Sequence, residues 1–176
     1  MKLLLPILAL AALWQAPALA QTIEDDAVAA VRDICLPASE TSVPARDFAL
    51  QAGYADMPLP EFITEYFPAA AKASAYRAPA GAKVIVASAV MPAAPFSCVV
   101  FFLGDAPDMA ARVKALRGAR EGYALEDSPS SDDQETLSLD SAAKGRKDKI
   151  LMLREKDGTA GFVVAYKASA ETDALR

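Results

Sequence analysis

The residues of this chain that could perform chemistry are carboxylates, hydroxyls, amines and two cysteines, because the 176-residue sequence contains no histidine. Without histidine there is no Ser-His-Asp or Cys-His nucleophile pair, no imidazole acid or base and no histidine-ligated metal. The net charge of −5 also disfavours general nucleic-acid binding, which usually needs a basic face. We therefore expect no cofactor, no metal and no nucleic-acid partner.

One pair of carboxylates has a spacing suited to catalysis. Glu61 and Glu65 are four residues apart, so on a helix they share a face. Two neighbouring carboxylates can divide general acid and base work, as in a hydrolase of cell-wall polymers, if they line a cleft at a defined separation. The alternative, which we favour, is a solvated helix face beside Phe62 and Tyr66.

Two further signals for chemistry are weak. The acidic segment 126–135 lacks the alternating carboxylates and the glycine that a calcium loop needs. Ser141 and Lys144 have the Ser-x-x-Lys spacing, but Gly145 makes their context typical of a turn rather than of a helix start in a cleft. The sequence as a whole favours a non-catalytic protein and leaves enzyme activity open.

The first 20 residues have the order of a secretory signal peptide. Lys2 supplies a positive start, an apolar run extends from Leu3 to Trp14, and small residues at 18 and 20 precede a polar segment. This run is shorter than the roughly 20 residues that cross a bilayer. We expect cleavage after Ala20, no transmembrane span and a bacterial periplasmic or secreted location. A retained N-terminal anchor helix is the alternative.

The two cysteines fit such a location. Cys35 and Cys98 both follow the expected cleavage site, and in an oxidising compartment an even pair predicts one disulfide. Their separation does not match the spacing of a metal site. The bridge would close a loop of about 64 residues, which the chain-entropy model values at roughly 4 kcal/mol.

Two groups of side chains are candidates for contact with a partner. Aromatic residues concentrate between positions 48 and 76, although packing under a loop explains such a cluster more often than binding does. Basic residues gather near positions 112–120 and 144–149, where weak contact with anionic surfaces or an acidic protein competes with ordinary solvated charge. The candidate binding residues are Tyr54, Phe62, Tyr66, Arg117, Arg120, Arg146 and Lys147.

The apolar periodicity and the end signals predict helices first and strands mainly afterwards. Helical patterns occupy 22–36, ended by Pro37, then 44–52 and the stretch between Asp105 and Gly118, with two short helical turns at 61–67. Strand patterns occupy 82–90, 96–103, 136–140, 149–155 and 161–167. The Asp157-Gly158 dipeptide predicts a hairpin between the last two strands.

This order, α-α-β-β-α-β-β-β, predicts one α+β domain over residues 21–168 with a frayed tail at 169–176. We expect a single antiparallel sheet of about five strands, with the helices on one face and the disulfide fastening the first helix to the second strand. For function, we expect a non-catalytic envelope protein that binds another protein or an envelope component. A small carboxylate-dependent cell-wall hydrolase and a secreted inhibitor of a hydrolase are the alternatives.

Overall fold

The structure is a computed structural model that describes residues 22–41, 43–67, 70, 72–79, 83–90, 96–116, 123–126, 130–141, 148–157 and 160–167. The expected signal peptide (1–20) and tail (169–176) lie outside the described residues. So do four of the predicted binding residues, namely Arg117, Arg120, Arg146 and Lys147, and of Tyr66 only the backbone is described.

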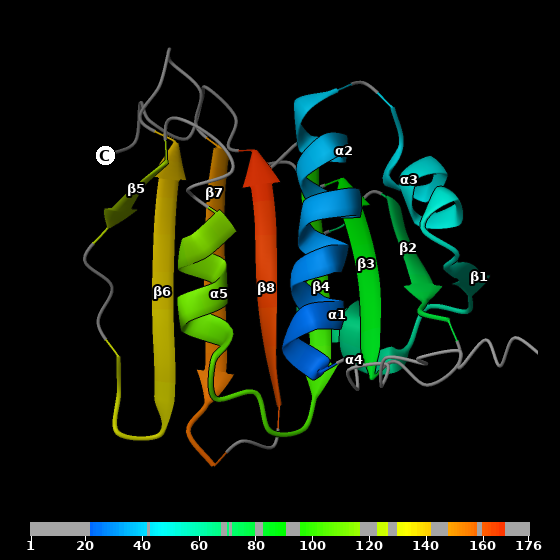
Figure 1. Ribbon diagram of the computed structural model, residues 1–176. Coiled ribbons are helices and arrows are strands. Elements are labelled where there is room, and N and C mark those ends of the chain that lie inside the picture. The colour runs from blue at the N-terminus through cyan, green and yellow to red at the C-terminus, as the bar shows by residue number, and fades with distance from the viewer. Residues whose placement is uncertain are drawn as a thin grey trace, which may run out of the picture.

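A single antiparallel sheet organises the described residues, in the order β1-β2-β3-β4-β8-β7-β6-β5 (Figure 1). Its strands are β1 (Ala55–Met57), β2 (Lys72–Arg77), β3 (Val84–Val90), β4 (Phe96–Leu103), β5 (Tyr123–Glu126), β6 (Gln134–Ser141), β7 (Asp148–Glu155) and β8 (Ala160–Lys167). The mixed helix and sheet class is confirmed. β8 lies beside β4, so the first four strands and the last four meet at the centre of the sheet.

The prediction of about five strands was too low, because eight strands are found among the described residues. The additional strands are β1, β2 and β5. In β2 the residues at 73–75 are Ala-Ser-Ala, which have little intrinsic preference for a strand. β2 instead pairs along its whole length with β3, from Lys72 opposite Val90 to Arg77 opposite Ile85. Pairing with a neighbour, which the local sequence does not encode, therefore makes this segment a strand.

Most of the helices cover one face of the sheet (Figure 1). They are α1 (Ile23–Ala30), the π-helical segment η1 (Val31–Cys35), α2 (Leu36–Glu40), α3 (Ala45–Gln51) and α5 (Met109–Leu116). The sequence predicted that the first helix ends at Pro37, but helical structure continues through Pro37 to Glu40. Pro37 instead falls in the first turn of α2, just after the π-helical turn, where its missing N–H removes no necessary hydrogen bond.

α1 begins with a capping box formed by Thr22 and Asp25. The backbone N–H of Asp25 donates to Thr22 Oγ1 at 3.2 Å, and the backbone N–H of Thr22 donates to Asp25 Oδ2 at 3.1 Å. Asp25 also forms an ion pair with Arg112 of α5. The carboxylate that starts the first helix therefore also ties it to the helix packed alongside.

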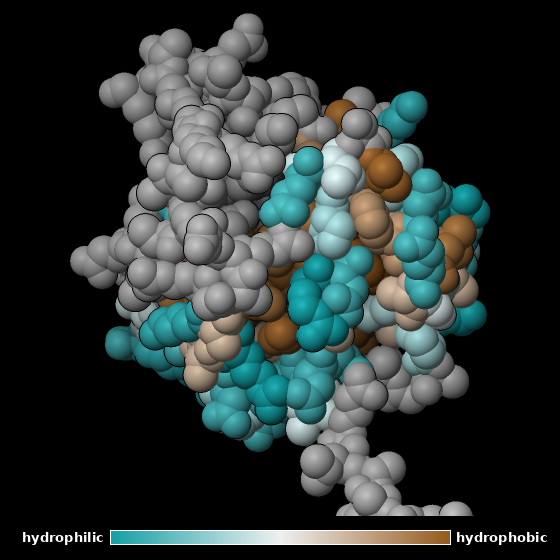
Figure 2. Space-filling view, turned by 45° about the horizontal axis from the view of Figure 1, so that its top comes forward, coloured by the Kyte–Doolittle hydropathy of each residue, from teal (hydrophilic) through white to brown (hydrophobic). Residues whose placement is uncertain are grey.

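The core is divided between the two faces of the sheet. The larger cluster lies under α1, η1, α2 and α5 and includes Val86, Val100 and Phe102. In Figure 2 the described part of the visible surface is mostly polar, with apolar side chains showing between the polar ones. The smaller cluster lies on the opposite face, where α4 (Glu61–Tyr66) buries Ile63 against Val99. The expectation that all helices share one face was therefore wrong for α4, because its apolar side chain at 63 packs on the alternate strand residues.

The predicted disulfide is confirmed. It joins Cys35, the last residue of η1, to Cys98 of β4, with 5.3 Å between the two Cα atoms. Both cysteines are fully buried. The bridge is compatible with an extracellular or periplasmic protein. In the described part of the chain, no helix is both long and apolar enough to cross a membrane.

Candidate functional site

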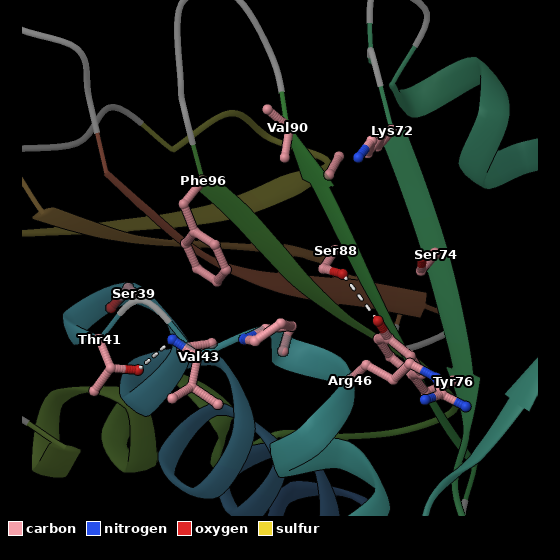
Figure 3. A pocket seen from close by; sticks show the side chains of 14 residues that line it. Ser39, Thr41, Val43, Arg46, Lys72, Ser74, Tyr76, Ser88, Val90 and Phe96 are labelled. Atoms are coloured by element: carbon pink, nitrogen blue, oxygen red, sulfur yellow. Dashed lines mark hydrogen bonds between the residues drawn. The ribbon is translucent and has the colours of Figure 1, made fainter.

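A pocket of about 520 Å³ lies between the helical layer and the adjoining ends of strands β2, β3 and β4 (Figure 3). One wall is formed by the strands and the other by α2, the following connection and the start of α3. This volume falls within the roughly 300–1,000 Å³ that is usual for small-molecule sites. The pocket is therefore large enough to enclose a small ligand.

The strand wall of the pocket follows from the register of β2 and β3. Alternate residues of a strand point to the same side, so Lys72, Ser74 and Tyr76 all face the helices. Lys72 lies opposite Val90, and Ser74 lies opposite Ser88. The wall therefore has a polar centre of two serines, with a tyrosine on one side and a lysine beside a valine on the other.

A hydroxyl pair lies at this polar centre. Tyr76 Oη and Ser88 Oγ are 3.2 Å apart, and either can donate to the other. Each hydroxyl has one donor and two acceptor lone pairs, so one mutual hydrogen bond leaves one O–H free to donate. Tyr76 is almost fully buried, which holds its ring against the core while its oxygen reaches the pocket. The pair is therefore a positioned hydrogen-bonding group for a ligand.

The hydroxyls of the helical wall are used by the protein itself. Ser39 Oγ donates to the carbonyl of Leu36 at 2.8 Å. Thr41 Oγ1 donates to the carbonyl of Pro37 at 2.9 Å and accepts from the backbone N–H of Val43 at 3.2 Å. These bonds shape the end of α2 and the turn that follows. The hydroxyls available to hydrogen-bond a ligand are consequently those of the strand wall.

The charged residues that line the pocket are both cations, although the chain as a whole is acidic. Arg46 of α3 is paired with Asp56 of β1, with Arg46 Nε 3.0 Å from Asp56 Oδ1 and Nη2 2.5 Å from Oδ2. Hydrogen bonding to Arg46 lowers the pKa of Asp56, and the same contact raises the pKa of Arg46. Lys72, in contrast, has no ion pair within the described part of the chain.

Among the described residues of the pocket lining, no carboxylate, histidine or lysine is hydrogen-bonded to a serine hydroxyl. A serine nucleophile needs a base within hydrogen-bond reach. No carboxylate lines the pocket, and the bonded partner of Ser88 is a tyrosine hydroxyl. The described residues also contain no group of three or more His, Cys, Asp or Glu side chains that could hold a metal ion. The arrangement is suited to binding.

The predicted carboxylate pair lies elsewhere. Glu61 and Glu65 are on α4, which packs on the face of the sheet opposite the pocket, and both side chains are exposed. A catalytic role for this exposed pair stays a prediction. Of the Ser141 and Lys144 pair, Lys144 lies outside the described residues.

The aromatic candidates are divided between the two faces. Tyr54 is 9% exposed and belongs to the core under the helices. Its burial, with smaller effects from Asp26 and Asp33, raises its pKa to about 12. Phe62 is 48% exposed on the other face and makes an edge-to-face contact with Phe101, with 5.3 Å between ring centroids. The two rings therefore do not form one binding surface, and a binding role for either stays a prediction.

The pocket residues Lys72, Ser74, Tyr76 and Ser88 were missed by the sequence analysis. One signal could have indicated them, namely polar or amphipathic side chains at every second position from 72 to 76. That alternation predicts a strand with one polar face, and here the polar face turns toward the helices. Comparisons with protein families, with curated proteins and with solved structures find no match to this chain. The function therefore has to be inferred from the pocket itself.

Proposed function

We propose that this chain is an exported, non-catalytic binding protein that holds a small envelope component in the pocket between α2–α3 and strands β2–β4. The observation that carries the proposal is a concave pocket of about 520 Å³, open to solvent on one side, that combines apolar walls with a few convergent polar groups. The lining offers hydrogen-bond donors and a cation, and neither Ser74 nor Ser88 is hydrogen-bonded to the Lys72 amine. Such a set of groups binds and orients a ligand without transforming it.

The frame around the pocket supports this function because it is held on both sides. Its strand wall belongs to β2, β3 and β4, which are paired with one another through continuous registers. Its helical wall begins three residues after Cys35, whose disulfide fixes that end of η1 to β4. A site built on such a frame loses little conformational freedom when a ligand binds.

The same observations weigh against the hydrolase alternative. A carboxylate-dependent hydrolase needs its acid and base in a cleft that also binds the polymer. Glu61 and Glu65 are exposed on the opposite face from the pocket. We therefore expect a Glu61→Gln/Glu65→Gln variant to bind the same ligands as the natural protein.

The proposal is tested by filling the pocket. Ser74 is exposed on β2 and faces the cavity, and tryptophan suits a strand, so Ser74→Trp should block the pocket without unfolding the sheet. Thr136→Trp, on the opposite face of β6, is the matched control. Mature oxidised protein is screened against envelope lipid and metabolite extracts by thermal shift, and bound molecules are identified by native mass spectrometry.

We expect at least one extract component to raise the Tm of the natural protein and of Thr136→Trp, but not that of Ser74→Trp. A ligand at 100 times its Kd adds about 2.7 kcal/mol to the free energy of unfolding, which such a screen detects readily. Ligands that stabilise all three proteins equally, or no stabilising ligand in any extract, would refute the proposal.

A further inference from the structure

We infer that the pocket selects small molecules that carry an anionic head group on an apolar body. This inference rests on the proposed binding function and adds the chemical class of the ligand. It comes from the distribution of charge and of exposed apolar side chains around the pocket, which are two independent observations.

The charge of the lining favours an anion. Lys72 and Arg46 are its charged residues, and no carboxylate is present among the described lining residues to balance them. The charge of Arg46 is already neutralised by Asp56. Lys72 has no such partner in the described chain, so its ammonium is the cation available to a ligand. A cationic ligand would be repelled, and a neutral one would gain less from Lys72 than an anion, because hydrogen bonds between two charged groups are stronger.

The apolar side chains beside Lys72 favour a ligand with an apolar body. Val90, its partner across the β2–β3 pair, is 45% exposed, and Val43 on the helical wall is 42% exposed. Phe96 of β4, which is half-buried, lies further along the strand wall (Figure 3). Large apolar groups exposed together in a concave site indicate a surface that a partner covers. The apolar body of a ligand would cover these three side chains while its head group meets Lys72.

The hydroxyls complete this arrangement. The free O–H of the Tyr76–Ser88 pair can donate to an oxygen of the head group or of a linkage next to it. A lysine ammonium is a compact point charge and accepts carboxylate or phosphate equally well. The structure therefore assigns an anionic head group on an apolar body, and experiment must distinguish a carboxylate from a phosphate ester.

The test compares probes that differ only at the head group. Binding of decanoate, decyl phosphate and decanol, each below its micelle concentration, is measured by calorimetry on the mature oxidised protein. We expect at least one of the two anions to bind about fivefold tighter than decanol, the preference that an exposed ion pair typically supplies. This preference should shrink with added salt, because exposed charges are screened.

Variants locate the effect. Lys72→Met keeps the side-chain length and removes the charge, so it should abolish the preference for the anion and leave decanol binding unchanged. Lys83→Met, an exposed lysine outside the pocket lining, is the matched control and should bind as the natural protein does. Ser74→Trp should block all three probes.

The outcomes separate the two proposals. A preference for only one anion supports the inference and identifies the head group. Equal binding of decanol and both anions, with no effect of Lys72→Met, overturns the anionic class but leaves the binding function standing. Probe binding that Ser74→Trp does not block, or no binding of either anion, overturns the inference. The binding function itself fails only if the extract screen with Ser74→Trp fails as well.

Discussion

Removing the disulfide should destabilise the protein by about 4 kcal/mol. The bridge spans a sequence separation of 63 residues. In the chain-entropy model, cross-linking a loop of that length takes about 4 kcal/mol of conformational freedom from the unfolded chain at 25 °C. Because small domains are stable by only about 5–15 kcal/mol, a Cys35→Ala/Cys98→Ala variant should lose a large share of its stability.

The loss should also be localised. The bridge ties the end of η1 to β4, which lies at the centre of the sheet beside β8. Without it, the helical segment 31–51 keeps only its packing contacts, whereas the sheet keeps its complete hydrogen-bond ladder. We therefore expect hydrogen exchange to accelerate in 31–51 well before it does in β4, β7 and β8.

Urea unfolding measures the free energy, and hydrogen exchange read by mass spectrometry locates the loss. Natural protein reduced with a thiol is the control, because it should lose the same stability without any change of side chain. A loss below about 1 kcal/mol would refute the loop-entropy reasoning. Equal acceleration at all amides would refute the idea that the bridge anchors the helical layer.

Three other substitutions test particular contacts. Burial raises the pKa of Tyr54 to about 12. The folded state therefore holds the tyrosine proton more tightly than the unfolded state does. The contribution of Tyr54 to the free energy of unfolding should be complete below pH 10 and fall by up to about 2 kcal/mol as the pH approaches 12. Tyr54→Phe should remove that fall, as followed by unfolding at alkaline pH. Hydrogen bonds at the start of α1 lower the pKa of Asp25, so its contribution is present above pH 3.8 and is lost on acidification; Asp25→Asn should lower the Tm at neutral pH, with a difference from the natural protein that shrinks in acid. A Cβ on Gly161 would overlap the buried Phe102 ring and lie 2.8 Å from the carbonyl oxygen of Leu153; Gly161→Ala should therefore cost about 1–3 kcal/mol in urea unfolding, and a neutral effect would contradict the tight packing of β8 on β4.

Local signals in the sequence were sufficient for the central strands. β3, β4, β7 and β8 are rich in β-branched or large apolar residues, and each was predicted within a few residues of its observed bounds. The capping box at Thr22 and the disulfide were also predictable, because each depends on a short pattern or on the cysteine count alone. These features could be predicted because each depends on residue types within a short segment or on the number of cysteines.

The strands at and next to the edges of the sheet, and the helix through Pro37, have weaker local signals. β2 is a strand because β3 is next to it, and Pro37 is tolerated because a π-helical turn precedes it. The pocket depends on both, since its residues come from segments that are distant in sequence. A shift of one residue in the β2–β3 register would turn Lys72 and Ser74 to the opposite face. The alternation at 72–76 indicates a polar strand face, but the strand pairing decides that this face lines a pocket.

The disulfide and the pocket are coupled through β4, and this coupling gives a further prediction. Cys98 lies opposite Ser88, so the bridge is next to the hydroxyl pair and holds the helical wall over it. If the pocket still forms in Cys35→Ala/Cys98→Ala, an anionic probe at 100 times its Kd should return about 2.7 of the lost 4 kcal/mol, as measured by urea unfolding. If the helical wall has separated from the strands, affinity falls and the same concentration returns much less. We expect the second result, because without the bridge only packing contacts hold the helical wall, with its exposed Val43, over the strands. A return of the full 2.7 kcal/mol would show that the pocket binds the probe without the bridge and would refute this coupling.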